Sequence, residues 1–172
     1  MPYYRYPHPC PARRNRGTEK VPGPVAAPAS GRVWGICRVA GQPGGNGSPL
    51  ALTLGTRQGD VVRLAPGGLS LILEPGRPYL VSLLVRGTPE QALSSFDQGS
   101  FTVTPQLDAS PVPALAAGTL LPTEGGPLPV SVSATFLLPP ADGPVSLSLL
   151  AECAGAGAAV ARLEGTVSVL GV

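Results

Sequence analysis

Apolar and small polar residues alternate along short stretches of this chain, and the alternation predicts β-strands. The clearest stretch is residues 129–138, where Val130 and Val132 occupy one face of an extended chain and Ser131 and Ser133 occupy the other. A strand with one apolar and one polar face is typical of an antiparallel sheet that covers a core.

Glycine, proline, serine and threonine interrupt the apolar stretches roughly every ten residues, as expected between the strands of a β-sandwich. We expect residues 41–49 to form a loop with an Asn-Gly turn, and residues 89–95 to hold a helical turn. The predicted fold class is all-β, an antiparallel two-sheet sandwich. Strands are predicted at residues 33–39, 50–54, 60–64, 69–73, 78–86, 100–108, 129–138, 144–150 and 159–170. The core that they would enclose consists of Val81, Leu83, Val85, Phe101, Val103, Val130, Val132, Phe136, Val145, Leu147, Leu163, Val167 and Val169.

Residues 1–30 differ in composition from the rest of the chain. They hold seven of the 22 prolines, three of the four tyrosines, the only histidine and the only lysine. This mixture predicts an extended, polyproline-like N-terminal arm, followed by one sandwich domain in residues 31–172. The arm would act as a flexible tether, and its candidates for anchoring or cross-linking are one thiol and three phenols, Cys10, Tyr3, Tyr4 and Tyr6.

Glycine and proline together make up about a quarter of the 172 residues, a share that is also found in disordered chains. Apolar residues nevertheless make up 43% of the chain and charged residues only 13%, so apolar burial can offset the loss of chain entropy. Most glycines and prolines are therefore interpreted as turns between strands.

The polar faces of the predicted strands carry serine and threonine, whereas soluble monomers usually keep charged residues on such faces. Several leucines are also left over for these outer faces, namely Leu80, Leu84, Leu137 and Leu150. This surplus indicates further burial against another subunit. The alternative is that loops of the same chain cover the faces.

Charge and hydropathy exclude several partners. The formal net charge is +2, but the first 20 residues carry the positive excess and the remainder is weakly negative, so no basic surface for nucleic acid is expected. No apolar stretch reaches the roughly 18 residues of a membrane-spanning helix, and the first residues lack the apolar segment of a secretory signal. We therefore expect no nucleic-acid partner, no membrane partner and no export by the general secretory route.

Motifs for catalysis are missing. The only histidine, His8, lies in the arm, so a nucleophile with a histidine base is not expected. The sequence Gly155-Ala156-Gly157 lacks the third glycine of a dinucleotide-binding fingerprint, and residues 44–47 lack the lysine of a phosphate-binding loop. We predict no catalytic residue, no cofactor and no enzymatic activity.

Metal and disulfide sites are not expected within one chain. The acidic residues form no calcium-binding pattern, and a carboxylate from Asp97 or Asp108 on a threefold axis is the alternative. Three cysteines are too few for a disulfide framework. We expect Cys37 and Cys153 to be small buried residues, with a Cys37–Cys153 bridge or a cross-link through Cys10 as alternatives.

Three segments resemble one known family. LSLILEPGRPYLVSLLVRG (residues 69–87), FTVTPQLDASPVP (residues 101–113) and the closing segment from VSVSATFLLPP to GTVSVLGV (residues 130–172) resemble C1q/TNF-like jelly-roll domains. The resemblance is to the bacterial version that ends collagen-like spore-surface glycoproteins of the BclA type, and it covers residues 50–172. The collagen-like stalk of those glycoproteins is not found, since Gly23-Pro24-Val25 begins no three-residue repeat.

The resemblance implies a ten-stranded jelly roll that assembles as a tight homotrimer. It implies a non-enzymatic display or adhesive head on a bacterial spore surface, exosporium or outer coat, tied to a scaffold protein through residues 1–30. One alternative is a phage fibre head or capsid decoration protein in a virion. Another is a carbohydrate-binding β-sandwich, whose aromatic platform would have to come from Trp34 and Tyr79.

Overall fold

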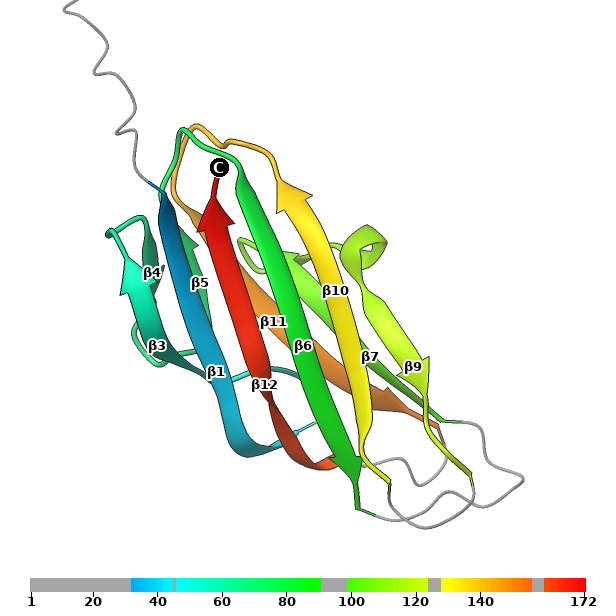
Figure 1. The fold of residues 1–172 in the computed structure, drawn as a ribbon. Coiled ribbons are helices and arrows are strands. Elements are labelled where there is room, and N and C mark those ends of the chain that lie inside the picture. Colours follow the sequence, from blue (N-terminus) through cyan, green and yellow to red (C-terminus); the bar gives the residue numbers. More distant parts are fainter. Residues whose placement is uncertain (1–31, 45, 91–98, 124–127, 156–159) are drawn as a thin grey trace, which may run out of the picture.

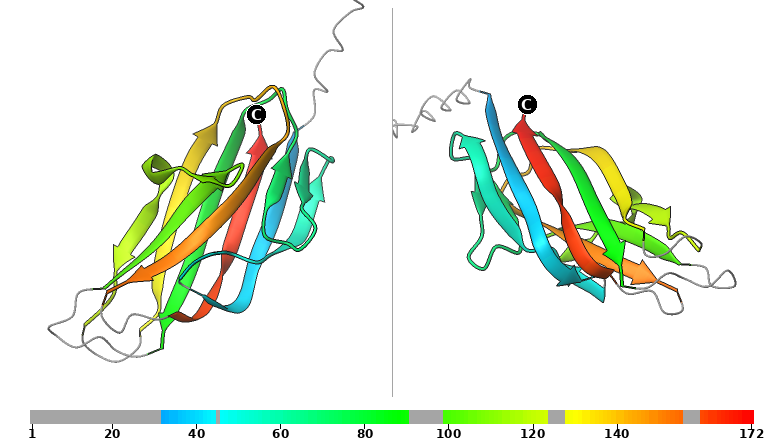
Figure 2. Two further views of the ribbon diagram at one scale, coloured as in Figure 1. Left: turned by 180° about the vertical axis from the view of Figure 1, so that it is seen from behind. Right: turned by 60° about the horizontal axis from the view of Figure 1, so that its bottom comes forward.

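The prediction of an all-β, antiparallel two-sheet fold is confirmed. The structure is a computed structural model that describes residues 32–172 without residues 45, 91–98, 124–127 and 156–159. In this part of the chain two antiparallel sheets pack face to face, and the only helix is a single 3₁₀ turn, η1 (Pro113–Leu115). Figures 1 and 2 show the two layers from the front, from behind and from below.

Each sheet is assembled from strands that are far apart in the sequence. The chain crosses from one sheet to the other between β3 and β4, β5 and β6, β6 and β7, β9 and β10, β10 and β11, and β11 and β12, which makes the sandwich a jelly roll. The five-stranded sheet has the order β10 (Val130–Leu138), β6 (Tyr79–Pro89), β12 (Val160–Gly171), β1 (Val33–Gly44) and β3 (Leu52–Gln58). The six-stranded sheet consists of β4 (Val62–Leu64), β5 (Leu71–Leu73), β11 (Val145–Ala154), β7 (Ser100–Leu107), β8 (Ser110–Pro111) and β9 (Ala117–Leu120).

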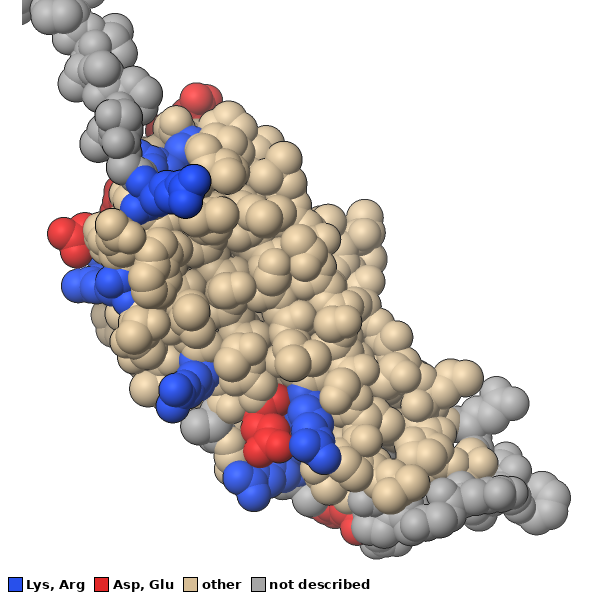
Figure 3. Space-filling view, viewed as in Figure 1, with Lys and Arg blue, Asp and Glu red and all other residues tan. Residues whose placement is uncertain are grey.

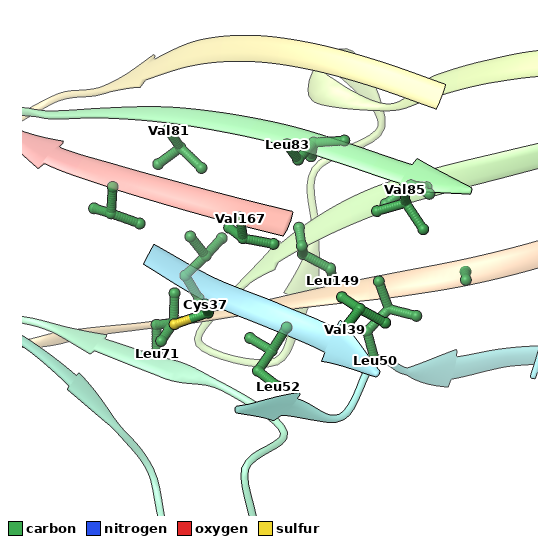
Figure 4. Close-up of a cluster of buried hydrophobic side chains, with 14 of the residues drawn as sticks. Cys37, Val39, Leu50, Leu52, Leu71, Val81, Leu83, Val85, Leu149 and Val167 are labelled. Atoms are coloured by element: carbon green, nitrogen blue, oxygen red, sulfur yellow. The ribbon is translucent and has the colours of Figure 1, made fainter. Parts of the chain in front are cut away.

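The core lies between the sheets and is built from every second residue of each long strand (Figure 4). In β6, for example, Val81, Leu83 and Val85 are buried. Phe101 of β7 packs against Gly87 of β6, where a Cβ atom would lie 3.3 Å from the aromatic ring. The residues expected in the core are all buried except Val130 and Val145, which are half-buried because they begin their strands.

The predicted loop at residues 41–49 is wrong, because most of this segment is extended. β1 continues to Gly44 through two register shifts against β12, and β2 (Asn46–Pro49) follows it. Gly41 and Gly47 have φ values of +47° and +71°, which glycine adopts without steric cost, so the strand can bulge without ending. The pattern also missed the short strands β8 and β9, whereas most of residues 89–95, the expected helical turn, lies outside the described residues.

The close approach of β12 to β6 predicts a severe cost for any side chain at Gly165. A Cβ atom there would overlap the carbonyl oxygen of Leu84 and would lie 2.9 Å from the Cα atom of Val85. We expect Gly165→Ala to lower the free energy of unfolding by about 3 kcal/mol, as strong overpacking does. Urea denaturation measures the change.

Gly143→Ala is the matched control, because a Cβ atom at Gly143 would meet nothing within 4 Å. This variant should stay within about 0.5 kcal/mol of the wild type. Equal stability of the two variants would contradict the close packing of β12 on β6.

Candidate functional site: the open face of the five-stranded sheet

The outer face of the five-stranded sheet is the candidate site, and we call it the open face. The register of the strands arranges its side chains in rows that run across the sheet. The first row contains Leu137, Leu80, Leu170 and Trp34. The second contains Thr135, Ser82, Ser168 and Ile36, and the third contains Ser133, Leu84, Thr166 and Arg38.

Large apolar side chains are exposed on this face. Leu137 and Leu84 are 59% and 50% exposed, and Ile36 is 37% exposed. Leu80 and Leu170 are half-buried between their neighbours. Because apolar area of this kind is favourably removed from water, the open face has the surface of a contact that remains to be covered.

Several polar groups among the apolar residues of the open face are already partnered within the face. Thr135 Oγ1 donates to Ser82 Oγ over 3.1 Å, and Ser168 Oγ donates to the carbonyl oxygen of Ser82 over 3.4 Å. Trp34 Nε1 donates to Gln58 Oε1 over 2.9 Å. Covering these groups would therefore strand few hydrogen-bonding atoms, which is the main cost of burying polar surface.

Charged residues gather at one end of the open face, which we call the charged end and which consists of Arg38, Arg86, Arg162 and Glu164. Figure 3 shows blue and red atoms there and a wide uncharged area over the middle of the sheet, with further charged atoms at the opposite end and along one edge. Arg86 pairs with Glu164 at 3.9 Å, and Arg162 pairs with the same carboxylate at 3.5 Å. The open face thus has an apolar part and a basic end.

The surplus leucines separate by sheet. Leu80, Leu84 and Leu137 lie on the open face, whereas Leu150 lies half-buried opposite Thr104 on the outer face of the six-stranded sheet. The exposed apolar rows are therefore a property of the five-stranded sheet.

Both described cysteines are free thiols, so the alternative of a Cys37–Cys153 bridge is not realised. Cys37 is buried and comes from β1, whereas Cys153 is half-buried and comes from β11 in the other sheet. Burial raises the pKa of both thiols above the ordinary value of 9.0. Cys10, Tyr3, Tyr4 and Tyr6 lie outside the described residues.

The candidate metal ligand Asp108 has a local structural role. It lies with a φ of 49° in the turn between β7 and β8, where its Oδ1 accepts a hydrogen bond of 2.8 Å from the backbone N–H of Ser146. Asp97 lies outside the described residues. Within the described ranges no group of three or more histidine, cysteine, aspartate or glutamate side chains is placed to hold a metal.

Trp34 and Tyr79 do not form an aromatic platform. Tyr79 is buried, and its hydroxyl donates to the carbonyl oxygen of Glu74 over 2.8 Å, whereas Trp34 lies on the open face. Burial raises the pKa of the Tyr79 phenol.

No helix in the described ranges is long and apolar enough to span a membrane.

Solved structures show which fold this is. The crystal structure of murine APRIL at pH 5.0 is similar with a TM-score of 0.52 at 9% identity, over 83% of this chain and 100% of that chain. The structure of Eiger TNF from S. frugiperda is similar with a TM-score of 0.51 at 12% identity, over 82% of this chain and 91% of that chain. The fold is a TNF-like jelly roll. The sequence matches no protein-family model and none of the curated proteins with which it was compared.

The different burial of the two thiols predicts different reactivity. In a Cys10→Ser variant, maleimide should label Cys153 in the folded protein, while Cys37 should react roughly a thousandfold more slowly because it is exposed only on unfolding. Peptide mass analysis with and without urea measures both rates. Comparable rates at the two thiols would contradict the packing of β1.

The raised pKa of Cys37 also sets a pH dependence of stability. The folded state holds the thiol proton more tightly than the unfolded state, so its contribution to stability is complete below pH 9 and is lost as the pH rises above it. Urea denaturation of wild type and Cys37→Ala from pH 7 to pH 10 should show a smaller alkaline loss in the variant. Identical alkaline losses would contradict this contribution.

Proposed function

We propose that this protein is a non-enzymatic structural protein whose jelly-roll domains associate as a homotrimer through the open face. The observation that carries the proposal is the set of exposed leucines on a sheet face where the hydroxyl groups of Ser82, Thr135 and Ser168 are already hydrogen-bonded. A trimer is the assembly that the sequence resemblance to C1q/TNF-like domains implies. The TNF-like fold supports the same proposal.

The proposed biological role is display on a bacterial spore surface, with residues 1–30 as the tether to a scaffold protein. The resemblance of residues 69–87, 101–113 and 130–172 to spore-surface heads supports this role. A sugar-binding role is less favoured, because Tyr79 is buried and contributes nothing to a stacking surface.

The proposal predicts that one charge in the apolar first row of the open face separates the copies. We expect the full chain to sediment as a trimer at micromolar concentration, and Leu137→Glu to weaken association roughly a hundredfold because the carboxylate would be buried beside Leu80, away from the charged end. Sedimentation velocity over a concentration series measures the change.

Leu120→Glu is the control, because Leu120 is 76% exposed on β9 of the other sheet. It should leave the trimer intact. A monomeric wild type, or dissociation by Leu120→Glu alone, would contradict association through the open face.

The display role has a separate test in a spore-forming host. A fluorescent fusion of the full chain should coat the spore, and deletion of residues 1–30 should release it into the mother-cell lysate while the deleted protein remains trimeric. Retention of the deleted protein on the spore would contradict the role of residues 1–30 as the tether.

A further inference from the structure

The charged end of the open face contains a shallow hollow of about 460 Å³. Gly165 and Thr166 of β12 lie between the longer side chains of Leu84 and Arg86 on one side and Arg38 on the other, and Ser131 lies beyond Arg86 on edge strand β10. All of these residues belong to the central and edge strands of one sheet, so the hollow is held by a rigid framework.

The hollow has more positive charge than its single carboxylate can neutralise. Glu164 Oε1 lies 3.9 Å from Arg86 Nη1, and its Oε2 lies 3.5 Å from Arg162 Nη2. Both distances are longer than the roughly 2.7–2.9 Å of a charge-assisted hydrogen bond. Among the residues that the structure describes, Arg38 has no ion pair. Most guanidinium N–H donors at this end are therefore open to a ligand.

The spacing of the arginines suits one small anion. Arg38 and Arg86 come from β1 and β6, which flank β12, so their strands are about 10 Å apart across the sheet. Two long side chains from these strands can converge on one group above Thr166. The guanidinium fork matches the oxygens of phosphate and sulfate, and the hydroxyls of Ser131 and Thr166 offer further donors.

We propose that this hollow binds a tetrahedral oxyanion of the phosphate or sulfate class, and that the bound anion strengthens association of the copies. The second part rests on the proposed function, because association through the open face would remove the charged end from water. Excess positive charge that is buried without a counter-charge opposes association, and three copies multiply that excess. An oxyanion in each hollow offsets it.

Calorimetric titration of the full-length protein with inorganic phosphate, at fixed pH and ionic strength, tests the site directly. Saturable binding is expected, and Arg86→Gln and Arg38→Gln should each weaken it at least tenfold. Arg57→Gln is the matched control, because this substitution removes the same charge at a position outside the hollow. Arg57 lies on edge strand β3, where it pairs with Asp60 at 3.5 Å. Binding without saturation, or equal loss in all three variants, would overturn the site.

A second arm distinguishes a free anion from one carried on a polymer. Long-chain polyphosphate at equal phosphate concentration should compete for the same hollow. If polyphosphate binds more than tenfold more tightly than inorganic phosphate, the natural ligand is an oxyanion attached to a polymer. Equal affinity for the two supports a free ion. Binding of polyphosphate that Arg86→Gln leaves unchanged would overturn its assignment to the hollow.

Sedimentation velocity separates this inference from the proposed function. Phosphate should shift the trimer to lower protein concentration than chloride does at the same ionic strength, and Arg86→Gln should abolish the shift. A trimer that is indifferent to phosphate overturns the coupling and leaves the proposed function intact. A monomer that binds phosphate in the wild type but not in Arg86→Gln supports the site and overturns the trimer.

Discussion

In the long strands of both sheets every second side chain is buried against the opposite sheet, and the chain crosses repeatedly between the sheets to achieve this. This burial fixes which face of each strand looks outward. Val81, Leu83 and Val85 enter the core, so Leu80, Ser82 and Leu84 must face away from it. The open face therefore results from filling the core with the side chains of one face of β6. It consists of the side chains that the other face directs outward.

The open face combines two surfaces with different requirements. Its leucine rows and internally bonded hydroxyls can leave water at low cost, whereas the arginines of the charged end keep their hydration unless another group replaces it. Both surfaces share strands β1, β6 and β12, so contact over the leucines brings the charged end near the partner. Apolar contact and charge compensation are therefore coupled by the geometry of one sheet.

Alternation along the sequence was enough to predict the fold class and the long strands, because each of these strands has one apolar face. It was not enough for β2, because a segment rich in glycine predicts a loop although it is extended in the structure. It was also not enough for short strands such as β9. The surplus leucines indicated a contact, but only the register showed that three of them share one face and that Leu150 does not. The hollow was beyond sequence analysis, because β1, β6, β10 and β12 supply its residues from distant parts of the chain.

The register of β6 is set by its own polar residues and by two close glycine contacts. The strand carries large apolar residues on both faces, so hydrophobicity alone would hardly oppose a slip of one residue that exchanges Leu84 with Val85. Ser82 and Arg86 do oppose the slip, because it would turn the outer face of β6 inward and bring both polar side chains into the core. The close contacts of Gly165 with β6 and of Gly87 with Phe101 add a steric requirement, since in any other register a larger side chain would take the place of a glycine. The polar residues of its own outer face and two glycines therefore hold β6 in place, and this leaves its outer leucines free for a contact with another molecule.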